Sequence, residues 1–219
     1  MNLLVATRNE HKLREISQIL GDRFALYSVT RFPWVGEIVE DSQTLEGNAL
    51  KKALGVSAQF ERGKLAETPT MDFVLADDTG LEVDALEGAP GVHTAYYGQE
   101  IRQEGESLYA ANNRKLLREL DIRGVRGKAR RARFKCVMAL ARAGREIGCF
   151  VGVCEGTIIN DHRGEQGFGY DPIFVPEGYC QTFAQLGESV KNEVSHRGRA
   201  LAALCGFLND AGGKQAGAL

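Results

Sequence analysis

The chain has 219 residues, of which 43% are hydrophobic and 26% are charged, so it contains enough apolar material to bury a sizeable core. Its 27 basic residues nearly balance 29 acidic ones, and the formal net charge is −2. This balance excludes a general basic field that would attract nucleic acid or an anionic membrane. Any phosphate-binding site must therefore be built locally.

The five cysteines are odd in number, form no C-x-x-C pair and lie mostly in apolar stretches. This pattern favours reduced core residues over disulfides or metal ligands. The apolar run at residues 3–6 is too short for a signal peptide, and no stretch approaches the roughly 20 apolar residues that span a bilayer. We therefore expect a cytoplasmic protein without nucleic-acid or membrane partners.

The first half of the chain alternates short strands with helices. Residues 3–6 are typical of a strand buried on both faces, and Leu13, Ile16 and Leu20 then recur at helical spacing. Alternation over residues 24–29 predicts a second strand. Residues 48–60 predict a second helix, because Leu50, Leu54 and Ala58 recur at i, i+4 and i+8.

The middle of the chain predicts a buried strand at residues 73–76 that ends in the polar sequence Asp77-Asp78-Thr79-Gly80. A helix at residues 112–120 follows. Residues 133–142 and 146–156 then read as two strands of a long hairpin.

The last third begins with a glycine-rich loop at residues 164–169 and a short strand at residues 173–175. A final helix over residues 200–208 places three leucines on one face, and we expect the Gly/Ala-rich residues 211–219 to fray. No linker or repeat divides the chain, so we predict a single α/β domain over residues 1–219, with helices on both faces of a mixed sheet.

The turn after the first strand could bind an anion. Asn9 is a good N-cap, and Lys12 lies one turn into the following helix. A helix N-terminus offers unpaired N–H groups and the positive end of the dipole, to which Lys12 adds a full charge. A capped helix with a solvated lysine remains the alternative.

Asp77 and Asp78 are adjacent on a strand, so their side chains should point to opposite faces and one of them should meet the ligand. A carboxylate there can bind Mg²⁺ or accept a proton from water, and Glu40 or Asp41 could supply a second acid. The alternative is an ordinary turn, because Asp-Asp-Thr-Gly is good turn chemistry.

Two later segments also offer ligand-binding groups. Phe168 lies between two glycines, which would let a planar base stack on its ring and contribute about 1–3 kcal/mol. Ser195 could cap the final helix, with His196 and Arg197 in its first turn, where cations oppose the helix dipole. That conflict makes sense if an anion or a carbonyl-rich base faces them. The alternative for Phe168 is an aromatic residue packed in the core. The alternative for His196 and Arg197 is that both side chains are solvated.

Taken in order, these segments closely resemble the inosine triphosphate pyrophosphatase family, whose substrates are deaminated purine nucleoside triphosphates. The resemblance extends through Thr44-Leu45, Asn48-Ala49, Lys52-Ala53, residues 88–91, Asn112, residues 115–117, residues 132–137 and residues 154–156. It implies an elongated mixed sheet flanked by helices, two lobes with the active site in the cleft between them, and a homodimer.

The resemblance also implies a reaction: Mg²⁺-dependent cleavage of ITP, dITP or XTP to the monophosphate and pyrophosphate. Asp78 matches the catalytic acid/base, and Asp78 with Glu40 matches the metal site. The substrate-binding positions carried over are Thr7, Arg8, Asn9, Glu10, His11, Lys12, Thr79, Phe168, Gly169, Tyr170, Asp171, Lys191, His196 and Arg197. Within this assignment, we expect Lys12 and Lys191 to meet phosphate. We expect His196, Arg197 or loop N–H groups to read the 6-oxo group of the base.

Two positions depart from the family pattern. Gly47 replaces an acid beside Asn48-Ala49, and Tyr96 replaces an arginine. Two other functions also compete with the main hypothesis. A Maf-like nucleotide pyrophosphatase would act on modified pyrimidines, and a nucleotide sensor would bind without turnover. Release of pyrophosphate from ITP separates these hypotheses.

Overall fold

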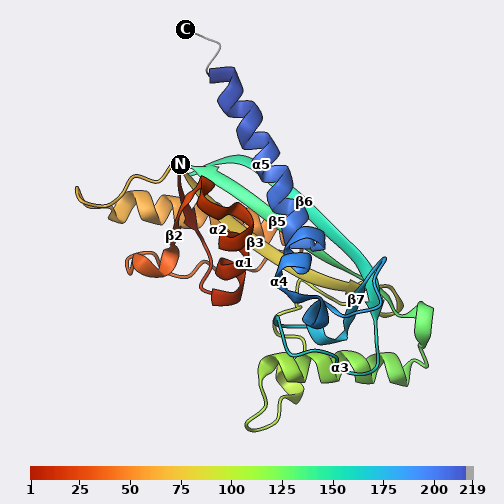
Figure 1. Cartoon of the computed structure of the whole chain (residues 1–219). Helices are drawn as coiled ribbons and strands as arrows, with labels where there is room; N and C mark the ends of the chain where they lie inside the picture. The colour runs from red at the N-terminus through yellow and green to blue at the C-terminus, as the bar shows by residue number, and fades with distance from the viewer. Residues whose placement is uncertain (216–219) are drawn as a thin grey trace. The chain divides into compact units, whose positions relative to one another are not determined.

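The computed structural model describes residues 1–215 and contains two compact units (Figure 1). The first unit comprises residues 1–78, 136–152 and the chain from residue 197 onward. The second comprises residues 79–135 and 153–196. Each unit is thus assembled from separate stretches of sequence.

The strands within residues 1–215 form a seven-stranded mixed sheet in the order β2-β1-β3-β5-β6-β7, with β4 paired to β3. β1 pairs in parallel with β2 and β3, whereas β4 and β7 join their neighbours in antiparallel fashion. The bounds are β1 Asn2–Val5, β2 Ala25–Ser28, β3 Phe73–Val83, β4 Pro90–Gly91, β5 Arg131–Arg142, β6 Arg145–Ile158 and β7 Phe174–Pro176.

The helices begin at polar capping residues. The side chains of Asn9, Thr44 and Ser107 accept hydrogen bonds from backbone N–H groups at the starts of α1, α2 and α3, and Thr182 forms a capping box with Gln185 at the start of α4. The bounds are α1 Glu10–Leu20, α2 Leu45–Gly63, α3 Leu108–Ile122, α4 Phe183–Val194 and α5 His196–Gln215.

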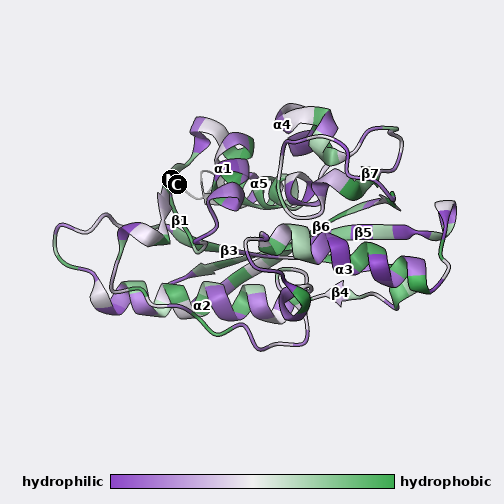
Figure 2. Ribbon diagram, turned by 90° about the horizontal axis from the view of Figure 1, so that it is seen from below, coloured by the Kyte–Doolittle hydropathy of each residue, from purple (hydrophilic) through white to green (hydrophobic). Residues whose placement is uncertain are grey.

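Both faces of the sheet in the first unit are covered. Leu3, Val5 and Leu75 pack in one core cluster with α1 and α5, while the alternating residues Leu4 and Val74 are buried on the opposite face. Figure 2 shows α1 and α5 on one side of these strands and α2 on the other. Each strand therefore reads as a continuous apolar run.

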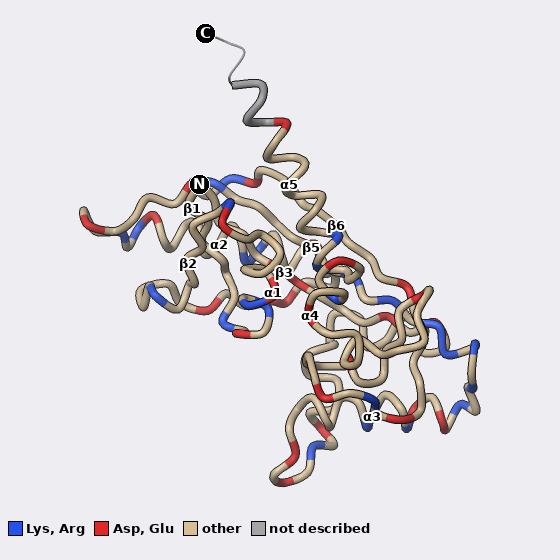
Figure 3. The backbone as a smooth tube through the Cα atoms, in the orientation of Figure 1, with Lys and Arg blue, Asp and Glu red and all other residues tan. Residues whose placement is uncertain are grey.

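The second unit has its own core. Leu81 and Val83 of β3 pack with Leu116 and Leu120 of α3 and with the aromatic residues Phe134, Tyr170, Phe174 and Phe183. Figure 3 shows acidic and basic residues interspersed along both units. The middle of α5 carries neither, in keeping with the leucines that it buries.

The prediction of a mixed α/β sheet with flanking helices is confirmed, as are the hairpin and the helix that starts after Asn9. The helix predicted at residues 48–60 is part of α2, whose buried face is formed by residues such as Ala49, Ala53 and Phe60. Two details were wrong. β3 does not end at residue 76 but continues through Asp77 and Asp78 to Val83, so Asp-Asp-Thr-Gly is strand and not turn.

The second error concerns the end of the chain. The predicted final helix at residues 200–208 extends from His196 to Gln215, so the expected fraying tail is helical as far as residue 215, and residues 216–219 lie outside the described part. The sequence analysis also missed α4 entirely. No helix among the described residues is long and apolar enough to cross a membrane.

Candidate active site

The loop from Thr7 to Lys12 is built around the cap of α1. The Asn9 Oδ1 accepts hydrogen bonds from the backbone N–H groups of His11, at 2.9 Å, and Lys12, at 3.2 Å. The Thr7 hydroxyl oxygen accepts from the Asn9 N–H, and an Arg8 guanidinium N–H donates to the Val35 carbonyl. Glu10 and His11 are exposed. The cap holds the backbone so that the Lys12 side chain turns toward β3.

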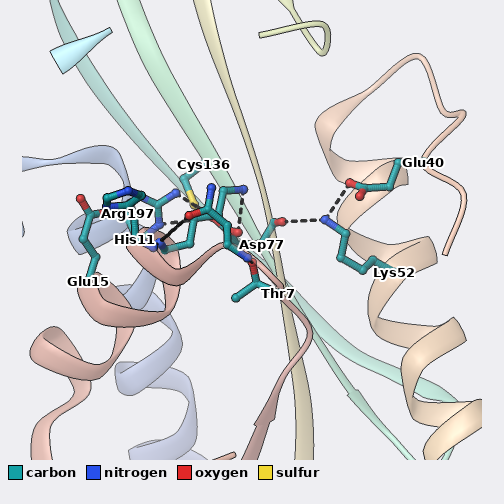
Figure 4. A network of polar contacts seen from close by, with 10 residues as sticks. Thr7, His11, Glu15, Glu40, Lys52, Asp77, Cys136 and Arg197 are labelled. Atoms are coloured by element: carbon teal, nitrogen blue, oxygen red, sulfur yellow. Dashed lines mark hydrogen bonds and ion pairs between the residues drawn. The ribbon is translucent and has the colours of Figure 1, made fainter. Parts of the chain in front are cut away.

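Asp77 is the centre of a buried ionic network in the first unit (Figure 4). Its Oδ1 lies 2.8 Å from the Lys12 Nζ, and its Oδ2 accepts from the Arg197 Nη2 at 2.9 Å and Nε at 3.2 Å. Burial alone would raise the pKa of the Asp77 carboxyl, but the charges of Lys12 and Arg197 hold it well below its usual range. Asp77 therefore stays ionised and orients both cations.

Arg197 lies where the sequence predicted a group that reads the base, but its guanidinium is buried and bonded to carboxylates of the protein. Besides Asp77 it donates to Glu15 of α1. The anion expected in front of this helix start is thus supplied by the chain. The contacts make Arg197 a positioning residue for Asp77 and Lys12, and its role at the base stays a prediction.

Asp78 points to the opposite face of β3, because side chains alternate along a strand. Burial raises the pKa of the Asp78 carboxyl to about 6; Lys12 and Lys52 oppose this shift, and Glu40 and Asp77 add to it. A carboxylate that titrates near neutrality can exchange a proton with water under physiological conditions. Among the predicted residues, Asp78 has the electrostatics of a general base.

Lys52 is a functional candidate that our sequence reasoning did not assign. Its Nζ lies 2.7 Å from the Glu40 Oε2 and donates to the Asp77 carbonyl at 3.2 Å. Lys52 thus sits between the two carboxylates proposed for the metal, Asp78 and Glu40. A signal was present, because Lys52 belongs to one of the segments that carried the resemblance.

The donor set fits a magnesium ion that also binds substrate. Carboxylate oxygens are the ligands that Mg²⁺ prefers, and it usually takes one or two of them together with phosphates. Glu40 and Asp78 are close enough that the charge of Glu40 raises the pKa of Asp78. The described residues contain no cluster of three or more His, Cys, Asp or Glu side chains placed to hold a metal alone. Glu40 and Asp78 are thus the candidates to hold such an ion.

The second unit holds the aromatic candidate. Asp171 accepts hydrogen bonds from the Phe168 backbone N–H, at 2.8 Å, and from the Lys191 Nζ, at 2.6 Å. The Lys191 Nζ lies 4.8 Å from the centre of the Phe168 ring, a cation–π contact. A Cβ at Gly167 would lie 2.1 Å from the Asp171 Oδ2, which explains the glycine there. Lys191 was expected at the phosphates, but these contacts put it beside the aromatic ring.

The remaining predicted residues of the second unit are mostly packed into it. Tyr170 is buried in the core, and its hydroxyl donates to the Thr94 carbonyl. The Gly169 carbonyl accepts from the Asn113 side chain, which ties the loop to α3. The buried His196 ring stacks on Phe134 with centroids 4.7 Å apart, and its role at the base stays a prediction. Thr79 follows Asp78 on β3 and is half-buried.

The two departures from the family pattern occupy different settings. A Cβ at Gly47 would lie 2.1 Å from the Ser42 Oγ, so the glycine makes room for the segment that precedes α2. Tyr96 is 65% exposed. Neither substitution alters Asp78 or the residues that raise and lower its pKa.

The fold and these groups define an α/β protein in which a carboxyl group with a pKa near neutrality lies within the electrostatic reach of two lysines. Such a site suits anions and a divalent metal. The model of the Ham1 family matches residues 3–207, and the chain belongs to this family. It is 43% identical over 210 residues to a dITP/XTP pyrophosphatase of Desulforamulus reducens, covering 95% of this chain and 96% of the relative. It is 46% identical over 203 residues to the protein of that name from Geobacter sulfurreducens, covering 92% and 94%.

Solved structures agree with this placement. A HAM1 protein from Coxiella burnetii superposes with a TM-score of 0.79 at 33% identity, covering 96% of this chain and 99% of that one. A nucleoside-triphosphatase, or dITP/XTP pyrophosphatase, from Mycobacterium abscessus has a TM-score of 0.66 at 40% identity, covering 93% and 98%. The family resemblance drawn from the sequence motifs is confirmed.

Proposed function

We propose that the protein hydrolyses deaminated purine nucleoside triphosphates, namely ITP, dITP and XTP, to the monophosphate and pyrophosphate. The observation that carries this proposal is Asp78, a half-buried carboxyl group with a pKa of about 6 that lies within the electrostatic reach of Lys12 and Lys52. The names of the relatives supply the substrate class. The reaction would remove deaminated purines from the nucleotide pool.

In the proposed mechanism, the Asp78 carboxylate accepts a proton from a water molecule, whose oxygen attacks the α-phosphorus. The bond from that phosphorus to the bridging oxygen breaks, and pyrophosphate leaves. Lys12 and Lys52 neutralise the charge of the triphosphate as it develops. Asp77 and Arg197 keep Lys12 in place.

Asp78 and Glu40 would hold Mg²⁺. When bound, this ion would withdraw charge from the phosphates and stabilise the leaving pyrophosphate. In the structure, Glu40 pairs with Lys52, so binding of metal and triphosphate would give each member of that pair a new partner. Metal binding and phosphate binding should therefore favour one another.

The base would stack on Phe168, and Lys191 would recognise it. The Lys191 ammonium donates to Asp171 and lies beside the Phe168 ring, so it is placed next to a base that stacks on that ring and can donate to the 6-oxo group of hypoxanthine or xanthine. Adenine presents an amino group at that position, which would set donor against donor. Selectivity is thus proposed to come from Lys191.

The test is to incubate the protein with ITP and Mg²⁺ and to identify the products, beside GTP, ATP and modified pyrimidine triphosphates. We expect IMP and pyrophosphate, and loss of turnover in Asp78→Asn with nucleotide binding retained. Binding without products would favour a sensor, and preference for the pyrimidines would favour a Maf-like enzyme. Turnover by Asp78→Asn within about tenfold of the unchanged protein would reject Asp78 as the base.

The quaternary structure and cellular location stay predictions. We propose the homodimer that the family resemblance implies, which light scattering coupled to size-exclusion chromatography tests directly. A monomeric mass at the concentration of the activity assay would contradict it. The cytoplasmic location is tested by cell fractionation.

A further inference from the structure

The segment that carries Glu40 lies along α2 without regular secondary structure. We call residues 32–44 the strap. It connects a short helical turn after β2 to the Thr44 cap of α2. Figure 4 shows Glu40 on this segment pointing toward Lys52 of α2. The position of Glu40 therefore depends on how the strap is held.

The strap is seated on α2 at a glycine. A Cβ built on Gly55 would lie 2.5 Å from the Cδ1 of Ile38 and 3.0 Å from its Cγ1, closer than real contacts allow. Gly55 is in the interior of α2, where glycine favours the helix less than alanine does. The absence of a side chain at Gly55 thus provides the space that Ile38 occupies.

The same arrangement recurs at both ends of α2. A Cβ on Gly63 would lie 2.1 Å from the Cδ1 of Trp34, and one on Gly47 would lie 2.1 Å from the Oγ of Ser42. The three glycines are eight residues apart in the helix, and the strap residues that face them are four residues apart. The strap is therefore in register with α2 over the length of the helix.

Hydrogen bonds hold the strap on either side of Ile38. The Gly36 N–H donates to the Gln59 Oε1 at 2.6 Å, and the Ser42 N–H donates to the Oδ1 of the buried Asn48 at 2.9 Å. Ile38 lies between these anchors and two residues before Glu40. The contact of Ile38 with Gly55 is thus well placed to control where Glu40 lies.

We propose that Ile38, seated against Gly55, is a positioning residue that holds Glu40 beside Lys52 and Asp78 for metal binding. The proposal rests on the proposed function only in taking Glu40 as a metal-binding carboxylate. Ile38 and Gly55 touch neither metal nor substrate. They act by keeping the strap in its register on α2.

The experiment compares Gly55→Ala with Gly206→Ala. Gly206 lies in α5, and a Cβ there meets no atom within 4 Å, so it is the same substitution in a helix without the collision. Two quantities are measured without nucleotide. One is the hydrogen-exchange rate of the backbone amides of Gly36 and Ser42, whose hydrogen bonds hold the strap on α2. The other is the affinity for Mn²⁺ alone, from the loss of the free-ion paramagnetic resonance signal. Thermal unfolding is recorded for each variant.

We expect Gly55→Ala to accelerate exchange of the Gly36 and Ser42 amides and to weaken Mn²⁺ binding about tenfold, as outer-shell changes at metal sites do. Gly206→Ala should change neither quantity. Ile38→Ala removes the contact from the strap side and should give the same two effects, which keeps the test decisive if Gly55→Ala does not fold. The double variant should be no worse than the single ones, because both break one contact.

Unchanged exchange and unchanged Mn²⁺ affinity in folded Gly55→Ala and Ile38→Ala would overturn the proposal, as would equal effects of Gly206→Ala. Glu40→Gln separates this failure from failure of the proposed function. If Glu40→Gln binds Mn²⁺ as tightly as the unchanged protein, the metal role of Glu40 is wrong, and accelerated exchange in the two strap variants still supports the positioning of its segment. If Glu40→Gln weakens binding and the strap variants do not, the positioning role is wrong.

Discussion

Asp77 and Asp78 are neighbours on one strand, yet replacement by the isosteric amide should move the stability of the protein in opposite directions. Asp77→Asn removes a carboxylate that two buried cations need. Asp78→Asn removes a carboxylate that is held in a site unfavourable to its charge. The comparison therefore tests the electrostatics of each face of β3.

The magnitude for Asp78 follows from its pKa. Burial raises that pKa to about 6 from the ordinary value of 3.8, so the folded protein binds the proton more tightly than the unfolded chain does. Ionisation of Asp78 therefore lowers the stability of the folded protein. This cost is fully present above about pH 6 and absent well below the pKa of Asp78 in the unfolded chain. At 1.36 kcal/mol per unit, Asp78→Asn should stabilise the protein by about 3 kcal/mol at pH 7.5, and by about a third of that at pH 4.5.

The sign for Asp77 is reversed. Burial would raise the pKa of its carboxyl, but Lys12 and Arg197 lower it, so its ionised form stabilises the fold above the unfolded pKa and that contribution is lost as the pH falls. Replacement by asparagine leaves two buried cations without their shared carboxylate. Removal of one partner from a buried ion pair typically costs about 3–5 kcal/mol.

The assay is thermal unfolding followed by circular dichroism at about pH 7.5 and pH 4.5. With roughly 2–4 °C per kcal/mol for a chain of this size, Asp78→Asn should raise Tm by about 6–12 °C at the higher pH and by far less at the lower one. Asp77→Asn should lower Tm by about 6–20 °C at the higher pH. Shifts of the same sign, or a gain for Asp78→Asn that does not depend on pH, would refute the reasoning.

Three further predictions concern activity. Between pH 7 and pH 5 the ionised fraction of Asp78 falls from about 0.9 to about 0.1, so kcat/KM should drop about tenfold. Lys52→Gln should raise the midpoint of this pH profile and Glu40→Gln should lower it, whereas titration of the substrate phosphates is common to all three proteins. Coincident pH profiles of the three proteins would exclude Asp78 as the titrating group. Phe168→Ala should raise KM for ITP by about 5- to 150-fold, from about 1–3 kcal/mol of stacking, with little change in Tm. A loss of stability at unchanged KM would show that the ring is structural. Lys191→Met should lower the ratio of kcat/KM for ITP to kcat/KM for ATP, a ratio that does not depend on the folded fraction of the protein. Lys52→Gln should leave this ratio unchanged. The reverse pattern would show that selectivity does not come from Lys191.

The sequence identified elements whose signals are local. The cap at Asn9 and the apolar run before it lie within a few residues of each other, so α1 and β1 were predicted closely. The helix α4 was missed because Gly187, with φ of 79°, interrupts its apolar spacing with a kink. A usable signal was nevertheless present in Thr182 and Gln185, which form the capping box.

β3 shows where local chemistry was overridden. Asp77-Asp78-Thr79-Gly80 favours a turn when read alone, yet the strand continues through it and pairs further along with β4. The ladder partners come from other parts of the chain, and their hydrogen bonds outweigh the local preference. The alternation expected of adjacent strand residues still held, and it separates the roles of Asp77 and Asp78.

Arg197 shows why the site was harder to predict than the fold. The sequence indicated that a cation opposing a helix dipole needs an anion, and that inference was correct. The anions are Asp77 and Glu15, which lie 120 and 182 residues away along the chain. No spacing rule connects positions so distant, so a substrate and a carboxylate of the protein were equally good partners on sequence grounds. Only the packing of α5 against α1 and β3 decides between them, and it assigns the positive charge of Arg197 to the protein's own carboxylates.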